Sequence, residues 1–414
     1  MKKTMIFALL TVFAPALQAQ EFSTATMRPI SMGEAYRLAV AKSEALAQQA
    51  EGIKQLEAAE QLIAAAFRPS VDFNASQYKQ QNSASLTKGY FTGSYALFSG
   101  MRDYISAKAA AAKTGSAKMD LERARQQLYL NVTQAFLDLF SAQQEVLIRH
   151  DQMDVTAKRI TELEARADIG RSRKSEVVAA QTQLAQDKAS YLNSAASERL
   201  AQQALIFITG LDTDLAPEEL LLAREGGLED YLKLALLRPD LAARRKALES
   251  YDYLAQIQDH NLWPTVALAA DYYIVRSPMP SPTDRWDGTI ALNVPLYTGG
   301  TAAAQKDSAY SAKRSAALAL QLSERQALTE VRSAYEEHKY SILQADSLKE
   351  ALALASDNAK YQQDDYKMGL VTNLDVLTAL NSVLQTRLAL LQAKVQGNFT
   401  LVKLETAAGL EAKQ

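Results

Sequence analysis

FRPSV at residues 67–71 returns as LWPTV at residues 262–266, and LFSG at residues 97–100 returns as LYTG at residues 296–299. The first pair is offset by 195 residues (69 to 264) and the second by 199 residues (100 to 299). The change of offset falls between two strand-like segments, so four extra residues lie in one loop of the second copy. The chain therefore contains two copies of one structural unit, and this repeat is the first constraint on its fold.

Both copies predict the same order of elements: a helix, two strands, a long helix and a returning helix. Alternating apolar and polar residues are typical of strands, while long proline-free runs with apolar residues three or four positions apart are typical of helices. In the first copy, residues 20–210, we expect a helix at 31–66, strands at about 70–78 and 89–98, a long helix at 103–167 and a returning helix at 175–208. In the second copy, residues 228–410, we expect a helix at 228–261, strands at about 266–275 and 289–296, a long helix at 301–367 and a final helix at 374–408. Residues 211–227 would link the copies through a small side element, and 411–414 would form a C-terminal tail. The predicted fold class is mainly α with β.

The long helix at 103–167 carries a stripe of apolar residues with coiled-coil spacing. At 1.5 Å per residue such a helix is about 100 Å long, which is typical of coiled coils and unusual in globular domains. We interpret the stripe as core packing and not as a ligand site. His338 stands on this stripe in the second copy where Leu139 stands in the first, and a satisfied buried histidine is the favoured interpretation over a pH sensor. The stripe consists of Leu128, Val132, Ala135, Leu139, Ala142, Val146, Met153, Ile160 and Leu163.

The first nineteen residues resemble a secretory signal peptide. Lys2 and Lys3 supply a positive start, residues 5–13 are apolar and small residues follow. Cleavage after Ala19 is favoured, although residues 14–16 also fit the rule for a cleavage site. Beyond this segment no apolar run approaches the 18 or more residues that a membrane helix needs.

Composition and motifs argue against several classes of function. The chain has no cysteine, so disulfides and thiolate metal sites are excluded, and its net charge of −2 does not favour nucleic acid. His150, His260 and His338 are scattered, without the spacing of a metal site, and no phosphate-binding glycine loop or nucleophile motif occurs. We therefore expect no enzymatic activity, no cofactor, no metal site and no nucleic-acid partner.

The four predicted strands have the length that crosses a bilayer when tilted, and each has one apolar face. Backbone groups in hydrocarbon must all be paired, which requires a closed barrel, and the smallest barrels have about eight strands. A single chain cannot close one, whereas two copies give eight strands and three give twelve. Twelve strands leave a lumen, so a conduit favours a trimer. Aromatic residues stand near the strand ends, as at membrane interfaces: Tyr78, Tyr90, Tyr95, Tyr272, Tyr273 and Trp286. The alternative is an exported periplasmic coiled-coil scaffold or surface adhesin without channel activity.

Three segments carry a family resemblance: SMGEAYRLA at 31–39, LRPDL at 237–241 and YKMGLVTNLDVL at 366–377. With the repeat, they resemble the TolC family of outer-membrane efflux and secretion channels over essentially the whole mature chain. The resemblance implies a homotrimer with a twelve-stranded barrel in the outer membrane, continuous with a twelve-helix α-barrel in the periplasm. It also implies an exit duct of a tripartite efflux pump or type I secretion system, with a periplasmic adaptor and an inner-membrane transporter as partners.

The two glycine turns, at 166–175 and 366–373, should form the periplasmic tips. Glu176 and Asp375 each lie six residues past the turn glycine, so a trimer would place three of each around one mouth. Carboxylates at that density favour cations and repel one another when the mouth narrows, and we expect this mouth to be the gate. The family's gate implies that Tyr366 hydrogen-bonds Glu176 in the closed state. The chain departs from the archetype where Val371 replaces a gate arginine and Thr378 a second acid.

Each tip feature also has a structural interpretation. Asp375 has capping-box spacing with Thr372, and this role and gating can coexist. Arg171, Arg173 and Lys174 could pair with Asp364 and Asp365 across the hairpins, although a solvated face is favoured. Turn geometry alone would explain both glycines. The candidate adaptor contacts are Arg166, Gly170, Ser175, Lys367, Gly369 and Thr372.

Overall fold

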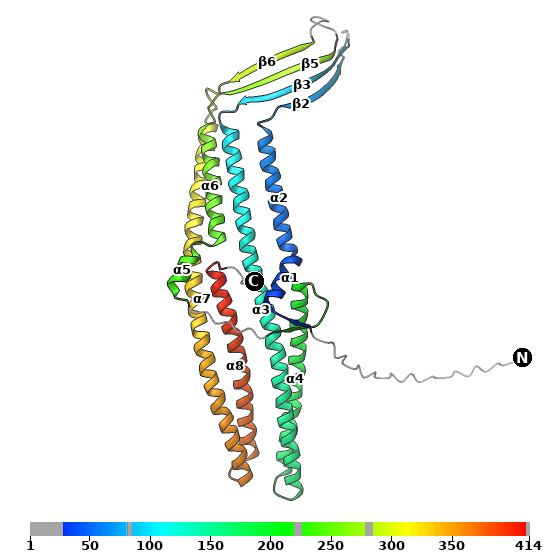
Figure 1. Ribbon diagram of the computed structural model, residues 1–414, viewed down its shortest axis with the longest axis vertical. Helices are drawn as coiled ribbons and strands as arrows, with labels where there is room; N and C mark the ends of the chain where they lie inside the picture. The colour runs from blue at the N-terminus through cyan, green and yellow to red at the C-terminus, as the bar shows by residue number, and fades with distance from the viewer. Residues whose placement is uncertain (1–27, 80, 82–84, 219–225, 278–284, 411–414) are drawn as a thin grey trace, which may run out of the picture.

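The computed structural model is a long shaft of helices with a β-sheet at one end and two helical turns at the other (Figure 1). It describes residues 28–79, 81, 85–218, 226–277 and 285–410. The predicted signal peptide at 1–19 and the tail at 411–414 lie outside these residues. The prediction of a mainly helical fold with some strands is confirmed.

The helices and strands follow one order twice along the chain. The first series is α1 (Met32–Lys42), α2 (Glu44–Ala65), β2 (Ser70–Tyr78), β3 (Leu86–Phe98), α3 (Arg102–Asp168) and α4 (Lys174–Thr209). The second is α5 (Leu228–Ala235), α6 (Pro239–Asp259), β5 (Thr265–Ser277), β6 (Trp286–Asn293), α7 (Thr301–Met368) and α8 (Asn373–Ala407). Two short strands, β1 (Arg28–Ile30) and β4 (Leu215–Pro217), pair in parallel beside the shaft.

Several predicted elements differ from the structure, and β3 and β6 each begin three residues earlier than expected. The single helix expected at 31–66 is interrupted at Ser43, whose extended backbone ends α1 and whose hydroxyl caps α2 by accepting from the Leu46 amide at 3.2 Å. The helix expected at 228–261 is interrupted before Pro239, because proline cannot donate inside a helix but is well suited to its first turn. The last strand ends at Asn293 rather than 296, shortly before Pro295.

The sheet at the end of the shaft has four antiparallel strands in the order β2-β3-β5-β6. Within the described residues β2 and β6 pair on one side only, so both edges are open. One face carries apolar side chains that are more than half exposed, among them Val71, Phe73 and Ile290. A large exposed apolar surface marks contact with another protein or with lipid.

The opposite face of the sheet is polar. Asp72, Thr92, Asp271 and Asp287 face one another in a single row across the four strands. The Thr92 hydroxyl donates to Asp271 at 2.7 Å and accepts from Asn74 at 3.1 Å. The sheet therefore separates an apolar surface from a hydrogen-bonded polar one.

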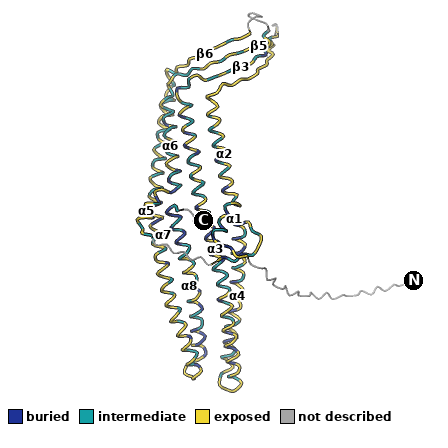
Figure 2. Tube along the Cα trace, in the orientation of Figure 1, coloured by how far each residue is buried: buried dark blue, intermediate teal, exposed yellow. Residues whose placement is uncertain are grey.

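The shaft is held by a seam of buried side chains along its helices (Figure 2). Within the predicted stripe, Val132, Ala135, Leu139, Ile160 and Leu163 are buried. The other members, Leu128, Ala142, Val146 and Met153, are half-buried. None of the described helices combines the length and the apolarity needed to span a membrane.

His338 also lies in this seam. Its ring is half-buried and its Nδ1 lies 3.2 Å from the Thr400 hydroxyl on α8. Burial lowers the pKa of His338, which favours the neutral ring. This arrangement agrees with a satisfied packing histidine.

Candidate functional site at the helical tips

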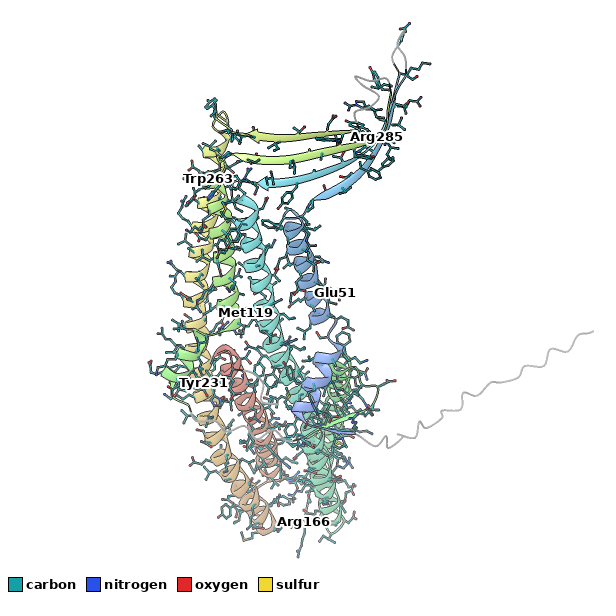
Figure 3. The ribbon with its side chains drawn as sticks, turned by 45° about the horizontal axis from the view of Figure 1, so that its top comes forward. Glu51, Met119, Arg166, Tyr231, Trp263 and Arg285 are labelled. Carbon is teal, nitrogen blue, oxygen red and sulfur yellow. The ribbon has the colours of Figure 1, made fainter. Side chains whose placement is uncertain are left out.

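The two helical turns lie together at the end of the shaft opposite the sheet. Figure 3 places Arg166 at this end and Trp263 at the junction between helices and sheet. Gly170 and Gly369 have φ of 74° and 76°, a left-handed conformation that favours glycine. In each turn an amide reaches back to close the helix, from Arg171 to the Arg166 carbonyl at 2.8 Å and from Leu370 to the Asp365 carbonyl at 2.9 Å.

The space around both turn glycines is open, since a Cβ built on either would meet nothing within 4 Å. Backbone conformation, rather than close approach of another part of the chain, therefore explains these glycines. Their exposure leaves them accessible to a partner, and the adaptor contact stays a prediction.

Tyr366 joins the two hairpins at the tip. Its hydroxyl donates to Glu176 Oε2 at 3.0 Å, a contact between α7 and α4 across 190 residues of sequence. The same oxygen accepts from the Ser172 hydroxyl at 2.7 Å. Tyr366 is only 6% exposed. The expected Tyr366–Glu176 hydrogen bond is present, while its role in gating stays a prediction.

Two arginines of α3 contact the Tyr366 ring, and neither contact was predicted. The guanidinium carbon of Arg159 lies 4.0 Å from the ring centroid and that of Arg166 lies 5.0 Å from it. Both distances are within the range of cation–π attraction. Arg159 Nε also donates to Asn373 Oδ1 at 3.0 Å, and Asn373 Nδ2 lies 3.5 Å from the Glu176 carbonyl oxygen.

An apolar cluster supports this polar group. Ile160, Leu163, Ala180 and Val376 are buried together with Tyr366. Val371, which replaces the gate arginine of the archetype, packs against the same cluster. The tip is thus a small core of its own, with polar contacts at its outer end.

Asp375 lies outside this group of contacts. Its Oδ2 accepts from the Thr372 amide at 2.8 Å and from the Thr372 hydroxyl at 2.6 Å, so it caps the start of α8. These hydrogen bonds hold the pKa of Asp375 below its usual value, which keeps the exposed side chain ionised. The structural interpretation of Asp375 therefore holds, and its part in the mouth stays a prediction.

The charged residues at the tip are mostly solvated. Asp364 pairs with Lys367 one turn along α7 at 2.9 Å, and within the described residues no ion pair joins Asp364 or Asp365 to the basic residues of the other hairpin. Among the candidate adaptor contacts Arg166 is half-buried, because it turns toward Tyr366. The exposed ones are Gly170, Ser175, Lys367, Gly369 and Thr372.

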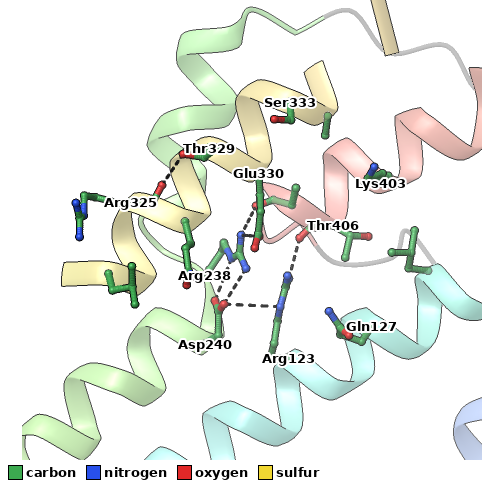
Figure 4. Close-up of a pocket in the computed structure, with 15 residues that line it drawn as sticks. Arg123, Gln127, Arg238, Asp240, Arg325, Thr329, Glu330, Ser333, Lys403 and Thr406 are labelled. Atoms are coloured by element: carbon green, nitrogen blue, oxygen red, sulfur yellow. Dashed lines mark hydrogen bonds and ion pairs between the residues drawn. The ribbon is translucent and has the colours of Figure 1, made fainter. Parts of the chain in front are cut away.

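A second charged cluster lies halfway along the shaft, in an open groove of about 880 Å³ (Figure 4). Arg238, from the LRPDL segment, is 3% exposed and donates to both oxygens of Asp240, to Glu330 at 2.6 Å and to the Ala407 carbonyl at 3.1 Å. It thereby joins the start of α6 to α7 and to the end of α8. Arg123 of α3 donates to the Thr406 carbonyl at 2.8 Å. This cluster fixes the junction of four helices.

The described residues contain no group of three or more histidine, cysteine or acidic side chains able to hold a metal ion.

Residues 232–410 match the sequence model of a family described as outer membrane efflux protein. The outer membrane efflux protein BepC of Brucella suis biovar 1 (strain 1330) is 22% identical over 307 residues, which is 72% of this chain and 66%, just under two thirds, of BepC. Among solved structures, CusC matches with a TM-score of 0.84 at 17% identity over 92% of each chain. The outer membrane protein VceC of Vibrio cholerae matches with a TM-score of 0.82 at 21% identity over 91% of this chain and 96% of VceC. At these identities the structural likeness shows a shared fold.

Proposed function

We propose that this chain, which belongs to the outer membrane efflux protein family, assembles as a homotrimer and forms an exit duct through the outer membrane. The carrying observation is the sheet, with two open edges and an exposed apolar face. Pairing β6 of one copy with β2 of the next would satisfy both edges, and three copies would close a barrel of twelve strands.

The two faces of the sheet support an aqueous lumen. In the proposed barrel the apolar face with Val71, Phe73 and Ile290 would contact lipid. The row of Asp72, Thr92, Asp271 and Asp287 would then line the interior. This agrees with barrels that carry water inside and hydrocarbon outside.

The helical shaft would continue the duct into the periplasm. Each copy contributes α3 and α7, of 67 and 68 residues, which at 1.5 Å per residue are about 100 Å long. Three copies would surround a channel with helices and bring six hairpin tips to one mouth. We infer that the Tyr366–Glu176 hydrogen bond keeps this mouth closed and that Glu176 and Asp375 favour cations there.

The proposed setting is a tripartite efflux pump or a type I secretion system. An inner-membrane transporter would deliver cargo, and a periplasmic adaptor would bind the exposed tip residues. The matching family and BepC are both outer membrane efflux proteins by name, which supports the first of these alternatives.

The decisive experiment is fractionation followed by reconstitution. We expect the protein in the outer-membrane fraction, a trimeric mass in detergent and cation-selective conductance in planar bilayers. Changing Glu176→Gln and Asp375→Asn together should reduce the cation selectivity without changing the mass. A monomer in the periplasmic fraction would instead support a soluble coiled-coil scaffold and refute the duct.

A further inference from the structure

We propose that Arg159 is the positioning residue of the gate: it holds the Tyr366 ring so that the hydroxyl reaches Glu176, and it couples all four helices of the tip. This inference rests on the proposed function, because it assigns Arg159 a part in keeping the mouth closed. Arg159 had no part in the Tyr366–Glu176 hydrogen bond that the sequence analysis predicted.

Four residues form a closed circuit of contacts at the tip, one from each helix. Arg159 of α3 lies against the ring of Tyr366 of α7, with 4.0 Å between guanidinium carbon and ring centroid. Tyr366 donates to the carboxylate of Glu176 of α4 at 3.0 Å. The Glu176 carbonyl lies 3.5 Å from the amide nitrogen of Asn373 of α8, and Asn373 accepts from Arg159 Nε at 3.0 Å.

Arg159 contributes two of the four contacts in this circuit. Both contacts form at once, since the guanidinium carbon lies over the ring while Nε donates to Asn373, and a planar guanidinium with several donors suits this arrangement. A lysine would keep the charge but not this double contact. Arg166, 5.0 Å from the same ring and half-buried, is a weaker second contact.

The burial of Arg159 argues for positioning rather than stability. The side chain is 6% exposed, and Nη2 has no hydrogen-bond partner among the described residues. Its one ion pair within the described part of the chain, to Glu162 at 3.1 Å, reaches a side chain that is 60% exposed. Burying a charge with an unused donor is costly, and an apolar residue of similar size is often as stable or more so. Stability therefore does not explain a buried arginine at position 159, whereas the orientation that it gives to the Tyr366 ring does.

The test is single-channel recording of the reconstituted trimer. Arg159→Met should raise the resting open probability about tenfold or more, as expected when a desolvated cation–π contact and a charge-assisted hydrogen bond are lost. Arg159→Lys should give a smaller increase. The matched control is Arg387→Gln, which removes an exposed 3.3 Å pair between α8 and Asp151 on α3, and it should gate as wild type.

Two further readouts separate positioning from a merely structural role. Trimer melting of Arg159→Met should be equal to or above that of wild type. In a double-mutant cycle, Arg159→Met should have a smaller effect on Tyr366→Leu than on wild type, because the ring contact is already lost and only the hydrogen bond to Asn373 remains to be removed.

Each outcome has one meaning. Wild-type gating of Arg159→Met alongside an open Tyr366→Leu channel would overturn the inference and leave the gate intact, as would additive effects in the cycle. Wild-type gating of both Tyr366→Leu and Glu176→Gln would refute the proposed gate itself. If Arg159→Met fails to assemble, the gating of Arg159→Lys is compared with that of Tyr366→Leu instead, with Arg387→Lys as the control. Wild-type gating of Arg159→Lys would then overturn the inference.

Discussion

Changing Tyr366→Phe removes a single hydroxyl from the proposed gate and leaves the ring between α3 and the apolar cluster of the tip. The lost hydrogen bond is 3.0 Å long and ends on a carboxylate. Hydrogen bonds to charged groups contribute about 1.5–3 kcal/mol. The lower limit applies, because Glu176 is half-exposed and keeps the bond from Ser172.

About 1.5 kcal/mol per copy becomes about 4.5 kcal/mol in a trimer whose three tips open together. Since every 1.4 kcal/mol is a factor of ten, the open-to-closed ratio should rise about 10³-fold. If the tips open independently, the rise should be about tenfold at each and the recordings should show intermediate levels.

The assay is the resting open probability of single channels in planar bilayers. Tyr361→Phe is the matched control, because this tyrosine lies five residues earlier on α7 and is 66% exposed. We expect it to match wild type. If the open probability of Tyr366→Phe lies within about threefold of the control, the hydroxyl contributes under about 1 kcal/mol in total. That result would refute the proposal that the Tyr366–Glu176 hydrogen bond keeps the mouth closed.

Three further predictions concern stability, each measured as a shift in denaturant-induced unfolding of the trimer. Arg238→Met should cost about 3 kcal/mol, because it removes both hydrogen bonds from Arg238 to Asp240 and leaves that carboxylate only its longer 3.9 Å pair with Arg123 and the Leu241 amide. Glu330→Gln, at a side chain 53% exposed, should cost under about 1 kcal/mol. Burial alone would raise the pKa of Asp240, but the hydrogen bonds from Arg238 outweigh burial and hold this pKa below its usual value. The native state therefore binds fewer protons than the unfolded state, and the stabilisation present at neutral pH should be lost as the pH falls below about 4. The Asp240→Asn variant should not show this loss. Leu163→Ala, at a fully buried position in the tip, should cost about 2–5 kcal/mol, and an effect under 1 kcal/mol would mean that the tip is not packed as described.

Much of the fold follows from local signals in the sequence. α3 and α7 lie within one residue of their predicted bounds, since glycine turns and proline-free runs mark their ends. The breaks at Ser43 and before Pro239 were missed because the apolar pattern continues across them. A serine cap competes with helix continuation only through local geometry, which periodicity does not report.

The tip shows where sequence reasoning reaches its limit. The Tyr366–Glu176 contact was expected only through the family resemblance. Arg159 and Asn373 were missed, because their contact joins residues 214 positions apart and a buried arginine beside a coiled-coil seam looks like a solvated one. The signal available was Arg159 directly preceding the stripe residue Ile160, which is too weak to distinguish the two.

The open edges of β2 and β6 also bear on how the proposed duct would assemble in the cell. Before assembly, a newly exported copy would have two unpaired edge strands and an exposed apolar sheet face in an aqueous compartment. Unpaired edge strands promote mispairing and aggregation. Survival of the chain would then depend on periplasmic chaperones and on the rate at which copies encounter one another, which rises steeply with synthesis. At low expression, more unassembled copies should be degraded by proteases. The number of assembled ducts should therefore rise more than linearly with gene dosage.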